Sequence, residues 1–299
     1  MKTSTAVHAA WTRKLAVPAF NIPYLPMMAP VVQASADEDA FCLAAVARLE
    51  WIKFESRSME AVIKEFFAQQ PGDQIRIHLD HIPVIDEDNQ EVPFIDLIAE
   101  AIDLGYQSVM VDGSRLSLDE NIRATRKVVI AARRSGVPVE AELGAVMGHE
   151  GTPVMSYEEM LRTKTGFTKP DEARRFVEET GCDWLSVAFG NIHGAVSETL
   201  RHDKKIAARL DIDHLKILQD AAGIPLVLHG GSGIPRKSIR RAMEHGVAKI
   251  NIGTELRQTY EQTLKHSSSI DQAQLAVYEQ TRTMLRDFFG VSGTAGRIA

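Results

Sequence analysis

Apolar and polar positions along this chain fall into two alternating patterns. Eight short segments are rich in Val, Ile, Leu or Ala and end in polar or glycine residues, which is typical of buried strands. The stretches between them repeat apolar residues at intervals of three and four, the spacing that gives a helix one apolar face. We expect strands over residues 15–21, 51–56, 75–81, 107–113, 138–144, 184–191, 225–231 and 248–254.

The intervening segments also carry helix start and stop signals. Ser117 is followed three residues later by Glu120, the pattern of a capping box. Other segments stop at glycine, and one begins on proline. We expect helices over 94–105, 117–136, 171–181 and 235–246, with a further one at about 271–290.

Eight alternations of strand and helix in one chain predict an α/β fold, a (β/α)8 TIM barrel. The alternative is an open doubly wound sheet, which usually carries a GxGxxG turn after its first strand, and the sequence has none there. No low-complexity segment or Pro/Ser/Gly-rich linker marks a boundary. Residues 1–299 are therefore predicted to form a single domain, with a C-terminal helical extension at about 268–299.

Composition narrows the class of protein. With 44% hydrophobic residues, 25% charged residues and a net charge of −6, the chain has the balance of a soluble protein and not of a non-specific nucleic-acid binder. Cys42 and Cys182 are too few for a disulfide framework, and the N-terminus lacks the apolar run of a signal peptide. No apolar stretch approaches the roughly 18 residues of a membrane span. We expect a cytoplasmic protein with no membrane or nucleic-acid partner.

Polar groups mark the C-terminal ends of the predicted strands, where barrel enzymes build their sites. A single polar residue at a strand end is more often a loop cap than a ligand, but here every strand supplies one, which favours a shared site. His78 alternates with Asp80 along its strand and is expected to point into the barrel core instead. The strand-end candidates are Asn21, Glu55, Ser56, Asp80, His81, Asp112, Glu142, His193, His229 and Asn251.

Three of these candidates are histidines from separate strands, namely His81, His193 and His229. Imidazoles that converge on a barrel mouth suit zinc, because a catalytic zinc takes three protein ligands and keeps a fourth position open for substrate. The alternative for any one of them is a histidine of the rim that is satisfied by neighbouring polar groups. The pattern therefore predicts a zinc site without excluding simpler roles for single members.

Glycine-rich and hydroxyl-bearing loops follow the last two predicted strands. GGSG spans 230–233 and NIGT spans 251–254, and in many barrels the loops at these two positions bind phosphate. Glycine lets the main chain approach an anion closely, and the serine and threonine add hydroxyl donors. The helix that begins at Pro235 could turn its positive end toward the same place. The sequence thus predicts an anion-binding loop directly after a candidate metal ligand.

These ordered motifs resemble those of the class II, metal-dependent fructose- and tagatose-bisphosphate aldolases over nearly the whole chain. The resemblance implies reversible cleavage of a phosphorylated ketose to dihydroxyacetone phosphate and an aldehyde. It also implies one catalytic Zn²⁺ and leaves room for a second divalent or monovalent cation. The matching stretches are VPAFN (17–21), HLDH (78–81), SVMVDGS (108–114), DENIRAT (119–125), VEAELG (139–144), GNIHG (190–194), VLHGGSGIP (227–235), KINIGTELR (249–257) and SGTAGRIA (292–299).

The resemblance further implies roles for individual residues. Asp80 matches the acid/base that handles the proton on the hydroxyl next to the cleaved bond. Glu150 matches a mobile-loop glutamate that moves the proton at the carbon that becomes the carbanion. The metal ligands match His81, His193 and His229, with Asp112 and Glu142 at an alternative or second metal position. The predicted substrate-binding residues are Asn21, Ser56, Gly194, Gly230, Gly231, Ser232, Asn251, Ile252, Gly253 and Thr254.

Three departures from the family pattern lie on the side that should hold the aldehyde. FESRSMEAV (54–62) stands where the family has a Ser-containing, Gly/Ala-rich stretch, and the mobile loop's Gly-Gly pair has become Met147-Gly148. IDQAQLAVY (270–278) replaces an Asp-Pro-Arg whose arginine reaches the far phosphate of a bisphosphate, and losing that clamp is not conservative. We expect an acceptor other than glyceraldehyde 3-phosphate, unless Arg57 or Arg115 replaces the arginine.

Other functions remain open from the sequence. The first alternative is an ordinary fructose- or tagatose-bisphosphate aldolase. A metal-dependent hydrolase also suits three histidines and an aspartate, although such enzymes usually carry a His-x-His on the first strand and VPAFN has none. A non-catalytic phosphosugar-binding barrel would be expected to have lost Asp80 or a histidine. Because family members pair through C-terminal helices, a homodimer or homotetramer is expected.

Overall fold

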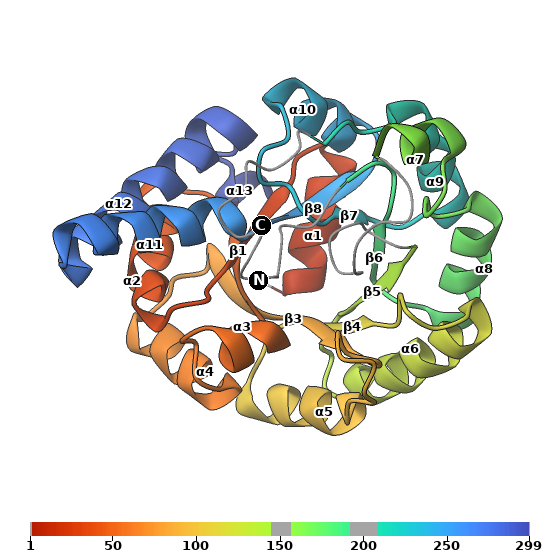
Figure 1. Ribbon diagram of the computed structural model, residues 1–299, viewed down its shortest axis with the longest axis horizontal. Helices are drawn as coiled ribbons and strands as arrows, with labels where there is room; N and C mark the ends of the chain where they lie inside the picture. The colour runs from red at the N-terminus through yellow and green to blue at the C-terminus, as the bar shows by residue number, and fades with distance from the viewer. Residues whose placement is uncertain (1, 145–156, 192–207, 299) are drawn as a thin grey trace.

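Eight parallel strands close into a barrel, in the order in which they occur along the chain (Figure 1). The computed structural model describes residues 2–144, 157–191 and 208–298. Helices surround the strands, so the predicted (β/α)8 barrel is confirmed. The strands are β1 (Val17–Asn21), β2 (Cys42–Ala47), β3 (Ile75–Pro83), β4 (Val109–Asp112), β5 (Val139–Leu143), β6 (Trp184–Val187), β7 (Leu226–Leu228) and β8 (Val247–Ile252).

The second strand lies earlier in the chain than the sequence pattern predicted. β2 is a continuous apolar run, buried along almost its whole length, as parallel strands covered on both faces are. Residues 51–56, the predicted strand, are divided between helix α3 (Arg48–Lys53) and the segment after it. Glu50 accepts a hydrogen bond from the Ala47 N–H at 2.8 Å, which stabilises the first turn of this helix. The prediction was wrong because WIKFES imitates the alternation of a strand.

The helices otherwise follow the predicted pattern closely. Gly105 and Gly181 end their helices in the left-handed conformation that glycine adopts without strain. The helices are α1 (Thr3–Thr12), α2 (Met28–Asp37), α3, α4 (Met59–Ala68), α5 (Phe94–Leu104), α6 (Leu118–Arg133), α7 (Tyr157–Thr163), α8 (Pro170–Thr180), α9 (Ile212–Ala222), α10 (Arg236–Glu244), α11 (Thr254–Ser267), α12 (Ile270–Thr283) and α13 (Ala295–Ile298), with a 3-10 turn η1 (Leu25–Met27) and a π-helical turn η3 (Met284–Phe289).

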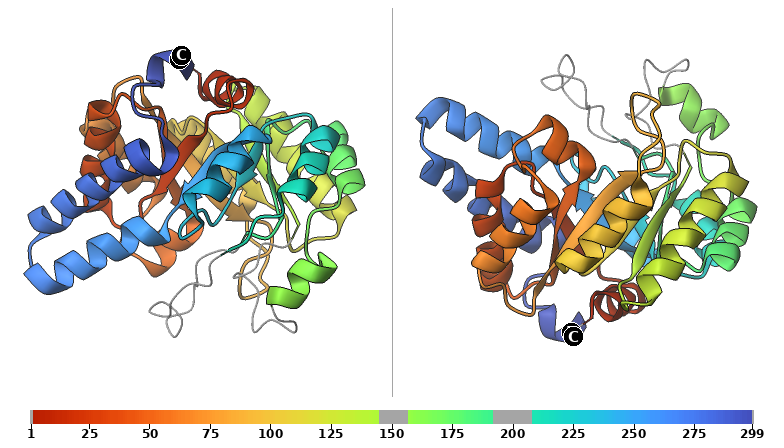
Figure 2. Two further views of the ribbon diagram at one scale, coloured as in Figure 1. Left: turned by 90° about the horizontal axis from the view of Figure 1, so that it is seen from above. Right: turned by 90° about the horizontal axis from the view of Figure 1, so that it is seen from below.

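Two apolar clusters fix the barrel. The larger one fills the space between the strands and the surrounding helices. The smaller one lies inside the barrel and under it, where Val7 and Ala10 of α1 pack with Trp184 and with Ile298 of α13. Figure 2 shows α1 and α13 together at one end of the barrel. Because this cluster closes the N-terminal end, polar groups inside the barrel face the opposite mouth.

The predicted C-terminal extension, at about 268–299, contains α12, η3 and α13, and α12 forms a hairpin with the preceding α11. α11 and α12 pack against each other, α12 also contacts α2, and the pair projects sideways from the barrel (Figure 2). None of the helices among the described residues combines the length and the hydropathy needed to cross a bilayer. That the chain is a single domain remains a prediction.

Asp211 offers a test of the local interactions that stabilise the fold. Its carboxylate caps α9 by accepting the His214 N–H at 2.9 Å, and it lies 2.8 Å from Lys164. Burial opposes the charged form of Asp211, but Lys164 and the His214 N–H outweigh it and lower the pKa. We expect Asp211→Ala to lower the free energy of unfolding by about 0.5–2 kcal/mol in urea titrations at pH 7.

The same interaction sets a pH dependence. Because the folded-state pKa of Asp211 is depressed, its contribution is present above the ordinary aspartate pKa of about 4 and disappears as pH falls through the folded value. The difference between the wild type and Asp211→Ala should therefore shrink in acid. Asp213→Ala, which removes an exposed carboxylate two residues away, should cost less at pH 7. Equal losses for the two variants would contradict the capping role.

Candidate functional site

Asp80 and His81 are consecutive residues of β3, yet both point toward the barrel mouth. Neighbouring side chains of a regular strand lie on opposite faces. Here the pairing between β3 and β4 advances three residues on β3 against two on β4, which identifies a bulge. His81 has a φ of 39°, in the left-handed region that few non-glycine residues adopt. The bulge therefore turns His81 to the same side as Asp80.

The imidazoles of His81 and His229 face each other across this mouth. His81 Nε2 lies 2.6 Å from His229 Nδ1. The outer nitrogens both face carboxylates, His229 Nε2 at 2.7 Å from Glu140 Oε1 and His81 Nδ1 at 3.3 Å from Asp112 Oδ2. An ionised carboxylate can only accept, so each outer nitrogen carries its hydrogen. The two facing nitrogens then present lone pairs to the same point.

Two facing lone pairs require a cation between them, either a proton or a metal. Burial disfavours a charged His81, but the carboxylates of Asp80, Asp112 and Glu142 outweigh it and raise its pKa to about 10. Burial and the charge of His81 lower the pKa of His229 to about 4. A proton or a metal ion between the two nitrogens would satisfy both lone pairs. Imidazoles oriented by outer carboxylates are also the donors that zinc takes, so these residues fit the expected metal.

Asp112 and Glu142 complete the acidic side of this cluster. Glu142 Oε2 lies 4.0 Å from His81 Nδ1 and 3.9 Å from His229 Nδ1. Burial and the nearby Asp112 charge raise the pKa of Glu142 to about 8. One ligand atom each from His81, Asp112 and Glu142 lies within 4.8 Å of the other two, a separation suited to one ion. The structure thus brings together all the predicted metal ligands except His193, which lies outside the described residues.

Asp80 is held by two asparagine side chains. Asn21 Nδ2 donates to Asp80 Oδ2 at 2.9 Å, and Asn251 Nδ2 lies 3.0 Å from both carboxylate oxygens. Burial opposes the charge of Asp80, but His81, His78 and Lys249 outweigh it and hold its pKa well below the usual range. Asp80 is therefore an oriented, ionised carboxylate next to the paired imidazoles.

A buried ion pair under the site escaped the sequence reasoning. Glu140 and Lys249 are fully buried, with Lys249 Nζ 2.8 Å from Glu140 Oε2 and 2.7 Å from Asn251 Oδ1. Burial opposes the charge of Glu140, but Lys249 and His229 outweigh it and lower its pKa to about 2. Contacts run without a break from His229 through Glu140, Lys249 and Asn251 to Asp80. The sequence did contain a signal for this ion pair. Glu140 and Lys249 each precede a predicted site residue by two positions and therefore lie on the same face of their strand as that residue.

His78 lies in the same interior, as predicted. Its ring is fully buried, and Nδ1 lies 2.8 Å from Ser108 Oγ. Nε2 lies 3.7 Å from Asp80 and 3.6 Å from Glu140. His78 therefore adds to the polar interior of the barrel, whereas His81 belongs to the mouth.

The loops after β7 and β8 lie side by side, as an anion site requires. The Gly231 N–H donates to the Asn251 carbonyl at 3.1 Å, so this amide serves the contact between the loops. Gly230 has a φ of 74°, in the region that favours glycine, and Ser232 is buried beside it. Gly253 is the N-cap of α11 and Thr254 its first residue, so the positive end of α11 adjoins these loops.

The structure shows the surroundings of three of the predicted substrate-binding residues, Ile252, Ser56 and Asn21. Ile252 has a fully buried side chain in the larger apolar cluster, so only its main chain can meet a ligand. Ser56 does not end a strand, because it follows α3, and its hydroxyl is buried with no hydrogen-bond partner among the described residues. Asn21 ends β1, as expected. Glu150, His193 and Gly194 lie outside the described residues.

Comparison with known proteins decides the family. The sequence matches the class II fructose-bisphosphate aldolases over residues 1–297. The chain belongs to this family. This membership makes it an aldolase, a carbon–carbon lyase, and removes the hydrolase from consideration. Among solved structures the chain is 29% identical to the YdjI aldolase from Escherichia coli K12, with a TM-score of 0.77 and 98% of each chain covered.

Two further solved structures are less similar in sequence to this chain. They support its fold and nothing beyond the fold. A Coccidioides immitis protein, provisionally described as a fructose-1,6-biphosphate aldolase, is 24% identical with a TM-score of 0.78, covering 99% of this chain and 98% of the other. The fructose-bisphosphate aldolase from Campylobacter jejuni is 18% identical with a TM-score of 0.71, covering 95% and 93%.

Glu50 is a further buried carboxyl group close to the barrel mouth, and the sequence pattern did not single it out. It lies one turn past β2, and it is buried, with 9% of the residue exposed. Burial and the nearby Asp80 raise its pKa to about 8, against the opposing effects of the Ala47 N–H, Asn21 and His81. The misplaced second strand hid this residue, since Glu50 then preceded the predicted strand instead of following one.

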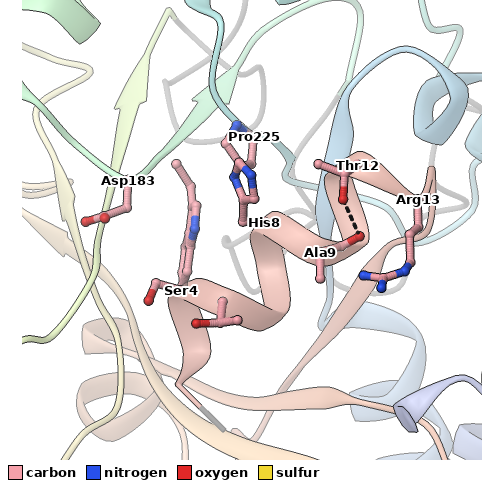
Figure 3. Close-up of a pocket in the computed structure, with 9 residues that line it drawn as sticks. Ser4, His8, Ala9, Thr12, Arg13, Asp183 and Pro225 are labelled. Atoms are coloured by element: carbon pink, nitrogen blue, oxygen red, sulfur yellow. Dashed lines mark hydrogen bonds between the residues drawn. The ribbon is translucent and has the colours of Figure 1, made fainter. Parts of the chain in front are cut away.

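A hollow at the other end of the aldolase is separate from this site. Its volume is about 510 Å³, and Figure 3 shows His8 of α1 on one side with Asp183 and Pro225 nearby. Asp183 and Pro225 directly precede β6 and β7, so the hollow lies at the N-terminal ends of the strands. Barrel enzymes place their chemistry at the opposite end. The hollow is therefore no part of the proposed chemistry.

Proposed function

We propose that this chain is a zinc-dependent aldolase that reversibly cleaves a phosphorylated ketose to dihydroxyacetone phosphate and an aldehyde other than glyceraldehyde 3-phosphate. The observation that carries the proposal is the pair of facing imidazole nitrogens of His81 and His229, 2.6 Å apart, next to the held carboxylate of Asp80. His81, His229 and the predicted ligand His193 would hold the ion. When bound, Zn²⁺ supplies Lewis-acid stabilisation of the negative charge left on the dihydroxyacetone phosphate half.

The residues of the chain divide the remaining work. The Asp80 carboxylate accepts the proton of the hydroxyl that becomes the aldehyde carbonyl, while Asn21 and Asn251 keep it aimed. The loops after β7 and β8 bind the phosphate of the dihydroxyacetone phosphate half through glycine main chain and through Ser232 and Thr254. Glu150 is the predicted group for the proton at the carbanion carbon. Asp112 and Glu142 orient His81 or hold a second cation.

A screen of aldehydes tests this function. Purified, zinc-loaded enzyme would be mixed with dihydroxyacetone phosphate and a panel of aldehydes with and without phosphate, and consumption of dihydroxyacetone phosphate would be followed. We expect turnover with unphosphorylated aldehydes and its loss after treatment with a chelator. Cleavage of fructose or tagatose bisphosphate with kcat/KM above about 10⁴ M⁻¹s⁻¹ would instead favour an ordinary bisphosphate aldolase.

The phosphate-binding loops give a second prediction. A Cβ at Gly231 would lie 2.6 Å from Ile250 Cγ2 and 3.0 Å from the Asn251 carbonyl, so alanine must displace the loop after β7 from β8. We expect Gly231→Ala to raise KM for dihydroxyacetone phosphate at least about tenfold in steady-state kinetics. Gly296→Ala, where a Cβ meets nothing within 4 Å, is the matched control. An unchanged KM would argue against this phosphate position.

We also propose a cytoplasmic homodimer or homotetramer that pairs through the α11–α12 hairpin. Ile270 and Leu275 of α12 leave 51% and 60% of their surface exposed on this projecting element. Burying such side chains against a second copy would gain about 25 cal/mol per Å² of apolar surface. We expect Leu275→Glu to lower the mass measured by light scattering after gel filtration. A wild-type monomer would contradict the proposal.

A further inference from the structure

His229 lies just beyond the hydrogen-bonded part of the sheet, and a side chain supports its main chain there. β7 ends at Leu228, and the pairing of β6 with β7 reaches only as far as Ser186 and Val227. The buried Asn191 donates from Nδ2 to the His229 carbonyl at 3.2 Å. This bond takes the place of the ladder hydrogen bond that a longer β6 would make. Asn191 thus holds the main chain at a predicted metal ligand.

The carboxamide of Asn191 can face only one way. Its Oδ1 accepts the Phe189 N–H at 2.9 Å. The His229 carbonyl can only accept a hydrogen bond, so it requires the amide nitrogen on its side. One asparagine therefore supplies the acceptor for one segment and the donor for the other. Alanine supplies neither and removes these partners from a buried N–H and a buried carbonyl.

The turn that carries Asn191, residues 189–191, is itself held by a phenol. Tyr157 of α7 donates its hydroxyl to the Gly190 carbonyl at 2.8 Å and accepts the Arg209 N–H at 2.6 Å. Gly190 has a φ of 105°, and a Cβ there would collide with the Arg209 carbonyl oxygen, so glycine is required for this close approach. The two bonds of one hydroxyl therefore fix the residue directly before Asn191.

We propose that Asn191 is a positioning residue that places the zinc ligand His229, and that Tyr157 holds Asn191 in turn. This inference rests on the proposed function, because it concerns the ion that His229 would bind. The proposed mechanism gives neither Asn191 nor Tyr157 a proton to move or a substrate atom to bind. Their effect is on the ligand: if the main chain at His229 is free to shift, the ion must fix it on binding, and its affinity falls.

Zinc titration of the metal-free protein against a competing chelator gives the first test. We expect Tyr157→Phe to raise the Kd for zinc about tenfold and Asn191→Ala to raise it about 10–100-fold, the usual cost of losing a group that orients a metal ligand. Tyr106→Phe is the matched control. Tyr106 is also buried and donates its hydroxyl to the Met59 carbonyl at 3.1 Å, but it precedes β4, at the end of the barrel opposite the mouth. We expect the wild-type Kd from this control.

A spectroscopic measurement separates positioning from stability. Co²⁺ added in place of zinc reports the arrangement of its ligands through its visible absorption bands. We expect these bands to shift in Asn191→Ala and in Tyr157→Phe, and to match the wild type in Tyr106→Phe. A merely structural role would lower the urea midpoint of both phenol variants alike and leave both spectra unchanged.

The outcomes separate the inference from the function on which it rests. Zinc Kd values within twofold of the wild type for Asn191→Ala and Tyr157→Phe, with unchanged cobalt spectra, overturn the proposal. A Tyr106→Phe variant that binds zinc as weakly as Tyr157→Phe overturns it too, because general loosening of the fold would then explain both. If Asn191→Ala does not fold, Tyr157→Phe decides alone. A wild type that binds no zinc would overturn the proposed function itself.

Discussion

We expect Asp80→Asn to lower kcat/KM for aldol cleavage by about 10²–10⁴-fold, the usual cost of removing a proton-transfer group. The amide keeps the shape of the side chain but cannot take the hydroxyl proton. It also meets the amide donors of Asn21 and Asn251, which now bind carboxylate oxygens at 2.9 and 3.0 Å. The measurement is steady-state kinetics of dihydroxyacetone phosphate release from the ketose phosphate found in the aldehyde screen.

Two further measurements isolate the role of Asp80. Zinc content and the Kd for dihydroxyacetone phosphate should change little, because Asp80 is predicted to bind neither the ion nor the phosphate. Asp103→Asn removes an exposed carboxylate on α5 and should retain wild-type kinetics. If Asp80→Asn kept its activity within about threefold, another group would have to accept the proton. A loss that is accompanied by loss of zinc would point to a structural role instead.

Replacing Lys249 with Met should have the largest effect on stability. The change leaves Glu140 fully buried without its partner at 2.8 Å, and breaking such a pair costs about 3–5 kcal/mol. Glu140 would respond by taking up a proton, and its contact with His229 Nε2 at 2.7 Å would then orient the imidazole less strictly. Loss of an orienting partner lowers metal affinity by about 10–100-fold. Urea unfolding and zinc titration against a competing chelator measure the two effects.

A double substitution separates charge from orientation at the same position. Glu140→Gln combined with Lys249→Met removes both charges, so we expect it to recover much of the lost stability. Zinc affinity should stay low, because an amide orients His229 less well than a carboxylate does. Lys127→Met changes an exposed lysine of α6 and should be neutral in both measurements. A Lys249→Met variant within 1 kcal/mol of the wild type would show that the ion pair is dispensable.

Lys249 also bears on the type of aldolase chemistry. A lysine inside a barrel invites comparison with Schiff-base aldolases, in which an amine attacks the substrate carbonyl. Here the ammonium is fully buried, 2.8 Å from Glu140 and 2.7 Å from Asn251 Oδ1. An amine held in this way is engaged as a cation below the mouth. The arrangement supports a positioning role for Lys249 and leaves the metal-dependent route as the one that the site residues suit.

The sequence alone determined the barrel and most of the residues at its mouth. Apolar runs alternating with amphipathic helices allow few arrangements, and the polar groups at the strand ends of a barrel must share one rim. His81, His229, Asp112 and Glu142 could therefore be expected to meet. The predicted position of the second strand was wrong because WIKFES alternates as a strand does. The true strand, CLAAVA, has no polar residue and therefore shows no periodicity.

Only the tertiary structure decided how these groups are aimed and what lies beneath them. The bulge in β3 that brings Asp80 and His81 to one side depends on the pairing with β4, which no local pattern encodes. The pairing of Glu140 with Lys249 depends on two strands far apart in sequence coming together in the barrel. Local sequence specifies which residues prefer a strand or a helix, but side-chain partners are selected by packing among distant segments, and that is settled only when the barrel closes.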